Sequence, residues 1–241
     1  MPEVTDRMTP RIARIDALHP AGCLFKVASS SESFRVEKFG GEEQFTRMLL
    51  DELRDGDVLF DIGACIGFVA IHAAKKGARV FAFEPDPSFR ARLRENLRLN
   101  DLSTVDVIAW AVSDSHGHAT LYSDGVAGLS PCLQATTNRD RGRVAVTIDT
   151  IDRGLARREL PIPNIIKLDI EGAEARALHG MQQLLKSANA PRAIFIEIHP
   201  TFLPTFGATV EEVHTRLAAA GYTVAYDEPR FDQILRIYRK P

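Results

Sequence analysis

A strand that ends in a glycine turn and leads into a helix is the feature that most restricts how this chain can fold. Residues 58–62 form an apolar run, Gly63 and Gly67 follow it, and residues 68–75 are predicted as a helix. A second apolar run at residues 80–83 ends on Glu84. Strands that alternate with helices in this way form a doubly wound, mostly parallel α/β sheet. A glycine turn with an acid about 20 residues further on favours a nucleoside-bearing cofactor over an ordinary strand–turn–helix.

The spacing inside the glycine turn indicates which cofactor. A dinucleotide site needs G-x-G-x-x-G, because the backbone N–H groups of that loop face a pyrophosphate. Here Asp61 stands at the first glycine position, which gives D-x-G-x-x-x-G. A carboxylate there repels phosphate and suits the cationic amino-acid end of S-adenosylmethionine, while Glu84 is predicted to accept hydrogen bonds from the ribose hydroxyls. The two acids favour a class I S-adenosylmethionine methyltransferase over a dehydrogenase.

Composition excludes several other classes. The 241 residues are 45% hydrophobic, which is enough for a full core, and the formal net charge of -2 provides no field that favours nucleic acid or an anionic membrane. The three cysteines (Cys23, Cys65 and Cys132) are too few and too scattered for a disulfide framework or a zinc site, and they indicate a reducing compartment. No apolar run approaches about 18 residues, and residues 1–15 do not form a signal peptide. We expect a cytoplasmic enzyme without nucleic-acid or membrane partners, in which the single tryptophan, Trp110, lies in the core.

The chain is predicted to divide into an N-terminal extension at 1–54 and a Rossmann-like domain at 55–241. In the extension, residues 1–20 are expected to be mobile or loosely docked, 24–27 and 33–39 to be short strands, and 42–53 to be a covering helix. In the domain we expect further strands at 105–111, 165–170 and 193–198, helices at 87–99, 172–186 and 209–220, and an antiparallel edge hairpin at 222–226 and 233–238. Residues 113–164 interrupt this alternation and are predicted as a substrate-side insertion with strands at 118–122 and 144–148.

Polar side chains that follow the later strands are the candidates for catalysis. In an open α/β sheet, ligands bind outside the carboxyl ends of the strands. Asp169 and Glu171 follow one apolar strand, and His199 follows the next, where it could act as a general base or as a structural hydrogen-bonding residue. Glu174 could share the cleft or simply favour the helix start. Carboxylates of this kind could hold magnesium, but nothing in the spacing requires it, so no metal is predicted.

Several segments together resemble the FkbM family of methyltransferases. They are D-I-G-A-C-I-G at 61–67, F-E-P-D at 83–86, Asn100, A-V-S-D at 111–114, V-T-I-D-T-I-D at 146–152, K-L-D-I-E-G-A-E at 167–174, and Glu197. The similarity covers residues 57–199, and its specific part is the D-x-G-A-x-x-G loop combined with K-x-D-x-E-G-x-E. The chain departs from the family at Cys65, where the family more often has asparagine. A thiol is a weak hydrogen-bonding group, so a side-chain contact could be lost there while the backbone N–H remains.

The resemblance implies O-methylation of a hydroxyl on a sugar, natural product or related small molecule. S-adenosylmethionine is the implied cofactor, and the acids at Asp169 and Glu171 are implied to face the active site; with His199, the candidate base from its place after a strand, they are the predicted catalytic residues. The predicted cofactor contacts are Asp61, Gly63, Ala64, Cys65, Gly67, Phe68, Glu84, Pro85, Ala111 and Val112. Two alternatives stay open: a non-catalytic protein that binds the cofactor, and a nicotinamide-dependent oxidoreductase. The sequence leaves the oligomeric state open, with a homodimer among the options.

Overall fold

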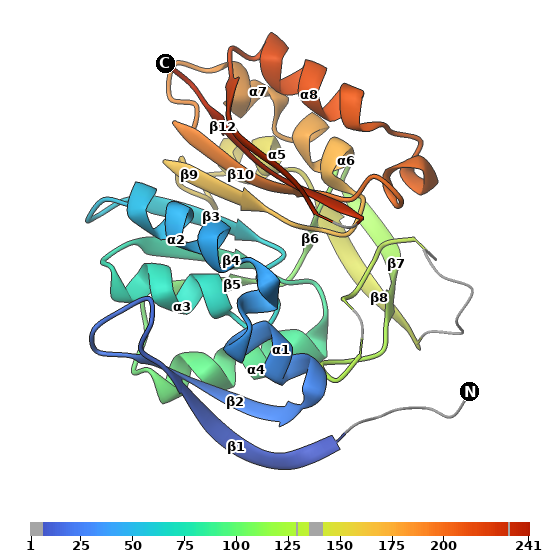
Figure 1. Ribbon diagram of the computed structural model, residues 1–241. Coiled ribbons are helices and arrows are strands. Elements are labelled where there is room, and N and C mark those ends of the chain that lie inside the picture. Colours follow the sequence, from blue (N-terminus) through green and yellow to red (C-terminus); the bar gives the residue numbers. More distant parts are fainter. Residues whose placement is uncertain (1–6, 129, 135–141, 231) are drawn as a thin grey trace.

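A seven-stranded sheet forms the centre of the fold (Figure 1). The computed structural model describes residues 7–128, 130–134, 142–230 and 232–241. The strands are β3 (Val58–Ile62), β4 (Arg79–Phe83), β5 (Val105–Ile108), β9 (Ile165–Leu168), β10 (Ala193–Ile198), β11 (Thr223–Arg230) and β12 (Gln233–Arg239). Their order is β11-β12-β10-β9-β3-β4-β5; the five from β10 to β5 pair in parallel, and the β11–β12 hairpin is antiparallel. The predicted fold class, with its antiparallel edge, is confirmed.

Helices cover both faces of this sheet because its strands are apolar on both sides. Leu59 of β3 packs in one buried cluster and its neighbours Phe60 and Ile62 pack in another, as the pleat requires. The first cluster includes residues of α2 (Glu43–Glu52), α3 (Phe68–Lys75) and α4 (Pro87–Leu99). The second includes residues of α5 (Ile151–Ala156), α6 (Glu174–His179), α7 (Gln182–Lys186) and α8 (Val210–Ala219).

Elements whose signals are local were predicted well. β3, β10 and α3 occupy the predicted ranges, and α2, α4 and α8 differ from theirs by at most a residue or two. The side chain of Asp86 accepts hydrogen bonds from the backbone N–H groups that open α4, which begins at Pro87. At α8, the Thr209 side chain accepts from the N–H of Glu212 at 3.1 Å, as its capping pattern predicts.

The N-terminal predictions were partly wrong. Part of the segment expected to be loosely docked forms a strand, and residues 33–39 form a helix and a turn instead of a strand. Ser29 caps that helix, because its Oγ accepts from the N–H of Glu32 at 3.2 Å and the Glu32 carboxylate reaches back to the N–H of Ala28 at 2.8 Å. The segment contains an antiparallel pair, β1 (Arg7–Ile15) with β2 (Cys23–Ser29), followed by α1 (Ser30–Glu37) and the 3₁₀ turn η1 (Phe39–Gly41).

This N-terminal segment is fastened to the sheet domain. Phe25 and Phe45 are fully or almost fully buried in the same cluster as Leu59 of β3. The backbone N–H groups of Leu24 and Lys26 donate to the side chains of Asn100, which caps the end of α4, and Asn96 on α4, each at 2.9 Å. At this edge of β2, two asparagine side chains therefore accept the backbone hydrogen bonds that another strand would otherwise accept.

Several predicted elements have different bounds, and the first strand of the edge hairpin, predicted at 222–226, extends to Arg230 as β11. The strand predicted at 105–111 ends at Ile108, and β6 (Ala111–Val112) belongs to another sheet. The strand predicted at 165–170 is β9, which ends at Leu168. The helix predicted at 172–186 is divided between α6 and α7. A Cβ on Gly180, at the break, would lie 1.9 Å from the carbonyl oxygen of Ser113, so this position requires glycine.

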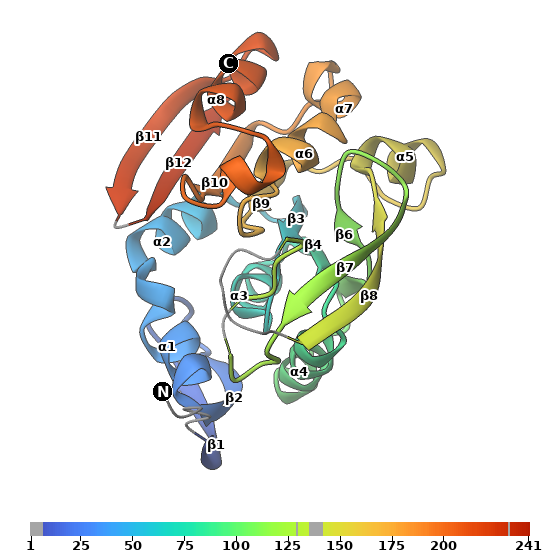
Figure 2. The same ribbon diagram turned by 90° about the vertical axis from the view of Figure 1, so that its right-hand side faces the viewer.

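The inserted region forms a small sheet of its own. β7 (Gly117–Ser123) and β8 (Gly142–Asp149) are antiparallel, and β6 pairs in parallel with β8. Both strands predicted in this region are confirmed; residues 129 and 135–141 lie outside the described residues. Figure 2 shows this sheet on one side of the ends of β3 and β4 and α1 on the other side. A 3₁₀ turn, η2 (Leu203–Phe206), follows β10. Among the described residues, no helix is long and apolar enough to cross a bilayer.

Candidate active site

A cavity of about 600 Å³ opens at the carboxyl ends of β3, β4, β9 and β10. This position follows from the topology, because β4 and β9 lie on opposite sides of β3 and their connections diverge there. Most of the predicted site residues line this cavity; Gly67 and His199 do not reach its wall. The predicted residues that do are Asp61, Gly63, Ala64, Cys65, Phe68, Glu84, Pro85, Ala111, Val112, Asp169 and Glu171.

The glycine turn fits closely against the neighbouring strand end. Gly63 has φ +85°, and a Cβ there would lie 1.8 Å from the backbone oxygen of Asp169. Gly67 has φ +88° and would collide with Leu93 of α4 at 2.1 Å. Both positions require glycine, for backbone conformation and for space. Cys65, between them, has φ +53°, a left-handed conformation that asparagine tolerates better than most residues, so the backbone at this position would favour asparagine over the cysteine that stands there.

Asp61 is a buried carboxylate without a hydrogen-bonding partner. The residue is 1% exposed, and neither side-chain oxygen accepts a hydrogen bond from any described residue. The nearest cation is the Nζ of Lys167, 3.9 Å from Oδ1. Burial raises the pKa of Asp61, and the charge of Lys167 opposes that rise. A ligand that brings a positive charge and N–H donors would satisfy this group, as the amino-acid end of S-adenosylmethionine does.

Glu84 is held in a fixed orientation by two backbone donors. Its Oε2 accepts from the N–H of Cys65 at 2.9 Å and its Oε1 accepts from the N–H of Asp86 at 2.8 Å. Burial nevertheless raises the pKa of Glu84 to about 8. Each oxygen keeps one lone pair free, so the carboxylate can still accept from a ribose diol. Trp110, expected in the core, is half-buried instead: it contacts Phe83 edge-on with ring centroids 5.1 Å apart and lines the same cavity.

Five carboxylates, which we call the acidic cluster, lie at the other end of the cavity. Glu174 of α6 is completely buried behind this wall, whereas Glu42, just before α2, contributes from the N-terminal segment. Burial and the nearby charges of Glu197 and Asp169 raise the pKa of Glu42 to about 9. Sequence reasoning missed Glu42 because it lies far from the other acids along the chain. The acidic cluster consists of Glu42, Asp169, Glu171, Glu174 and Glu197.

Lys167 joins the two ends of the cavity. Its Nζ donates to Oδ2 of Asp169 at 2.9 Å and lies 3.9 Å from Asp61. Burial lowers the pKa of this ammonium, but the charges of Asp169 and Asp61 outweigh burial and raise it. In return, Lys167 keeps the pKa of Asp169 below its usual value despite burial. Lys167 and Asp169 are therefore both charged at neutral pH.

His199 lies inside the acidic cluster. Its Nδ1 is 2.8 Å from Oε1 of Glu174, and its Nε2 is 3.5 Å from both Glu171 and Glu197. Burial alone lowers the pKa of this imidazole, but the surrounding carboxylates raise it to about 12. Burial raises the pKa of Glu171 to about 7, partly offset by the charge of His199. The imidazole is thus a cation at neutral pH and has no free site to accept a proton.

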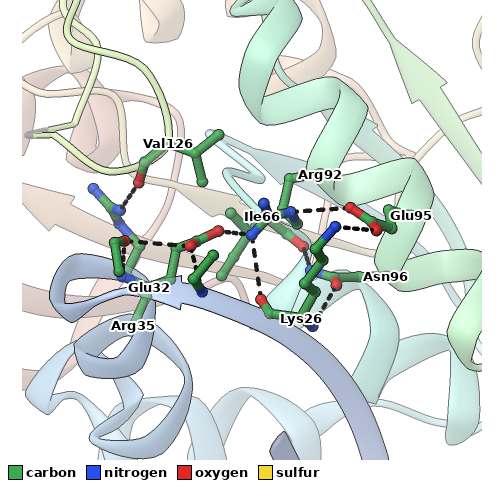
Figure 3. Close-up of polar contacts among 10 residues, drawn as sticks. Lys26, Glu32, Arg35, Ile66, Arg92, Glu95, Asn96 and Val126 are labelled. Atoms are coloured by element: carbon green, nitrogen blue, oxygen red, sulfur yellow. Dashed lines mark hydrogen bonds and ion pairs between the residues drawn. The ribbon is translucent and has the colours of Figure 1, made fainter. Parts of the chain in front are cut away.

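The N-terminal segment closes one side of the cavity through a polar network (Figure 3). Arg35 of α1 donates to the backbone oxygens of Val126 and Gly128, both at 2.9 Å, and so holds the inserted loop. Glu32 of α1 forms an ion pair with Arg92 of α4. On the same helix, the Nδ2 of Asn96 donates at 2.9 Å to the backbone oxygen of Ile66 in the glycine turn. One network therefore connects the cofactor loop, the N-terminal segment and the inserted loop.

The geometry agrees with comparison against known proteins. The family model described as "Methyltransferase FkbM domain" matches residues 61–224 of this chain. These residues include the glycine turn, Glu84 and most of the acidic cluster. The chain belongs to the FkbM methyltransferase family. Its family and fold imply S-adenosylmethionine as the methyl donor.

Two characterised relatives belong to the same family. The chain is 34% identical over 195 residues to the hexuronic acid methyltransferase AglP of Haloferax volcanii, a match that covers 79% of this chain and 75% of AglP. It is 31% identical over 214 residues to the 31-O-demethyl-FK506 methyltransferase FkbM of Streptomyces tacrolimicus, which covers 75% of this chain and 78% of that one. The chain is therefore a methyltransferase of this family.

Solved structures show the same fold at low sequence identity. The putative methyltransferase yhhF of Escherichia coli superposes with a TM-score of 0.53 at 13% identity, covering 96% of this FkbM-family chain and 99% of that one. The precorrin-6y C5,15-methyltransferase of Geobacter metallireducens gives 0.50 at 17% identity, covering 81% and 87%. These similarities establish a class I methyltransferase fold and nothing about the substrate.

Proposed function

We propose that this methyltransferase transfers the methyl group of S-adenosylmethionine to a hydroxyl oxygen of a small molecule such as a sugar or a natural product. The observation that carries the proposal is that the acids predicted to bind the cofactor and the acids predicted to face the acceptor line one cavity. Asp61 and Glu84 are predicted to hold the cofactor, Asp169 and Glu171 are predicted to face the acceptor, and all four line it. The volume of about 600 Å³ is in the range of small-molecule sites. The names of the two relatives designate a hexuronic acid and a 31-O-demethyl compound as what they methylate.

The cofactor supplies a methyl group on a positively charged sulfur, which needs little activation. The acceptor oxygen forms a bond to the methyl carbon, the carbon–sulfur bond breaks with its electron pair on sulfur, and the hydroxyl proton leaves. What the protein contributes is alignment of the acceptor oxygen, exclusion of water and a place for that proton. Arg35 and the loop it holds serve the first two purposes by covering the cavity.

The carboxylates are the better proton acceptors of the predicted catalytic residues. His199 is protonated and surrounded by Glu171, Glu174 and Glu197, so we assign it the task of holding those carboxylates in place. Asp169 and Glu171 line the cavity and face the acceptor, and each has an oxygen that can receive a proton. In this proposal Asp169 and Glu171 contact the acceptor, and His199 acts as a positioning residue.

The test is transfer of a labelled methyl group from S-adenosylmethionine to a panel of sugars, uronic acids and hydroxylated natural products. The wild-type protein should label at least one class. Asp169→Asn should lose at least 100-fold in kcat while its affinity for S-adenosylhomocysteine stays within about threefold. Glu84→Ala should instead lose detectable cofactor binding, because it removes the carboxylate that two backbone donors orient and that is proposed to accept the ribose hydroxyls.

The two rival functions predict different results in the same experiments. A non-catalytic cofactor-binding protein would bind S-adenosylhomocysteine and label no acceptor in any class. A nicotinamide-dependent oxidoreductase would bind NAD, although the buried Asp61 carboxylate repels a pyrophosphate. Normal turnover by Asp169→Asn would show that the acceptor binds elsewhere.

A further inference from the structure

An unpartnered imidazole nitrogen points into the acidic cluster. The His199 side chain is 2% exposed, and its Nε2 makes no hydrogen bond to any residue that the structure describes. Oxygens of Glu171 and Glu197 each lie 3.5 Å from this nitrogen, at the limit of hydrogen bonding. A buried polar atom left without a partner is costly unless a ligand completes it.

The other side of the same imidazole is firmly held. Glu174 is fully buried, and its Oε1 lies 2.8 Å from Nδ1 of His199 while it also accepts from the N–H of Gly172 at 2.9 Å. Because Glu174 accepts from Nδ1–H, Nε2 is directed into the acidic cluster, where a bound cation would displace the Nε2 proton and take up its lone pair. Metal-binding histidines are oriented by carboxylates in this way.

The spacing of the donor atoms suits a single ion. One ligand atom each from Asp169, Glu171 and His199 lies within 4.8 Å of the others. An ion with bonds of about 2.1 Å holds adjacent ligands about 3 Å apart and opposite ligands about 4.2 Å apart. The 3.5 Å between Glu171 and His199 lies inside that interval, and the 4.8 Å that bounds all three atoms exceeds it by about 0.6 Å.

Charge also favours a cation at this position. Among the described residues, the acidic cluster contains five carboxylates, and three cations oppose them at contact distance: Lys167, His199 and Arg230, which lies 3.9 Å from Glu42. Lys167 is already paired with Asp169 and lies close to Asp61. Carboxylate oxygens with one imidazole nitrogen are a donor set that suits Mn²⁺, and Mg²⁺ less well.

We propose that Asp169, Glu171 and His199 form a binding site for a divalent cation of the Mn²⁺ and Mg²⁺ class, with Glu174 as the residue that orients His199. An ion there would face the cavity and lower the pKa of an acceptor hydroxyl bound to it. That role in catalysis rests on the proposed function, whereas the binding of the ion does not.

The experiment titrates the purified full-length protein with MnCl₂ and follows free Mn²⁺ by electron paramagnetic resonance. The wild-type protein should bind one ion per chain with a Kd tighter than roughly 0.1 mM, and excess MgCl₂ should displace it. Asp169→Asn and Glu171→Gln should each weaken binding at least tenfold. Glu174→Gln should weaken it about 10- to 100-fold. Glu211→Gln, which changes an exposed carboxylate on α8, is the matched control and should bind as the wild type does.

Each variant is also titrated with S-adenosylhomocysteine, which reports on the Asp61–Glu84 end of the cavity and shows whether the variant is folded. If Asp169→Asn fails this check, His199→Asn replaces it. Absence of saturable Mn²⁺ binding to the wild type, or equal binding by the site variants, overturns the metal site. Methyl transfer at an undiminished rate in EDTA would overturn its catalytic role and leave the proposed function intact. Specific Mn²⁺ binding without methyl transfer to any acceptor would contradict only the proposed function.

Discussion

Substitution of Gly63 by alanine tests whether the glycine turn positions the acceptor end as well as the cofactor end. Gly63 has φ +85°, and the added Cβ would begin 1.8 Å from the backbone oxygen of Asp169. Real Cβ atoms keep at least 3.0 Å from such an atom, so the two backbones must separate by more than about 1.2 Å. The control is Gly56→Ala, which has φ +78° and no atom within 4 Å of the new Cβ.

The two substitutions share the conformational cost and differ in the collision. The left-handed conformation costs alanine about 1–2 kcal/mol, partly offset because alanine lowers the entropy of the unfolded chain. We therefore expect Gly56→Ala to lose about 1 kcal/mol. Forced overpacking adds about 1–3 kcal/mol, so Gly63→Ala should lose about 3 kcal/mol in all. The difference of about 2 kcal/mol is the contribution of the contact with Asp169.

Urea unfolding measures both free energies, and the slope of each transition shows whether the two states are comparable. Activity supplies the second measurement, since a displacement of about 1 Å near the reacting atoms costs about 100-fold in rate. Gly63→Ala should lose that factor in kcat even under conditions where it is folded, and Gly56→Ala should not. Equal unfolding free energies for the two variants would refute the reasoning, and so would normal cofactor binding and turnover by Gly63→Ala.

Three further substitutions test the surroundings of the cavity. Burial raises the pKa of Glu84 from 4.5 to about 8, so its contribution to folding is most favourable below about pH 4.5 and is lost as the pH rises towards 8. Ribose hydroxyls donate to the ionised form of Glu84 and favour it, so cofactor binding at pH 7 should release protons from this carboxyl. Calorimetry in buffers of different ionisation enthalpy should detect the release, and Glu84→Gln should release fewer protons than the wild type. Arg35→Ala should free the inserted loop, and it should therefore raise the KM for the acceptor about tenfold and also lower kcat, because that loop aligns the acceptor. Arg216→Ala, which breaks a pair on the surface of α8, should leave both constants unchanged in steady-state kinetics. Asn96→Asp should lower the unfolding free energy by about 2–3 kcal/mol in urea, because it sets a carboxylate against the backbone oxygen of Ile66; stability equal to the wild type would show that this contact is unimportant.

How much could be predicted depended on how local the signal was. The strand and helix around the glycine turn were predicted correctly because alternating buried runs and glycine positions are local features. The error at residues 33–39 arose from a local signal that was overlooked. Ser29 and Glu32 form the S-x-x-E pattern that opens a helix, and in the structure both side chains cap α1.

Other differences have causes that one sequence does not contain. The approach of Gly180, between α6 and α7, to the backbone of Ser113 is a contact between residues far apart along the chain, and it requires glycine there. Glu42 and Arg35 enter the cavity wall only because the N-terminal segment packs against α4 and the inserted loop. Asp61 and Glu84 could be recognised in advance because each stands at the carboxyl end of a parallel strand. The boundary predicted at residue 54 and the oligomeric state remain predictions.

Lys167 links the predicted cofactor acid Asp61 electrostatically to the predicted acceptor acid Asp169. This link explains why one strand and its extension carry both Lys167 and Asp169. Lys167 and Asp169 are two residues apart, so they lie on the same face of β9 and its extension. β9 pairs with β3, and in that pairing Asp61 lies directly beside Lys167. The ammonium is shared unequally, at 2.9 Å from Asp169 and 3.9 Å from Asp61. Asp61 therefore lacks a close cation until a positively charged ligand arrives, and Asp169 already has one. A cationic cofactor would pair with Asp61, and Lys167 would then keep Asp169 ionised. The ionised form of Asp169 is the one that accepts a proton or binds a cation.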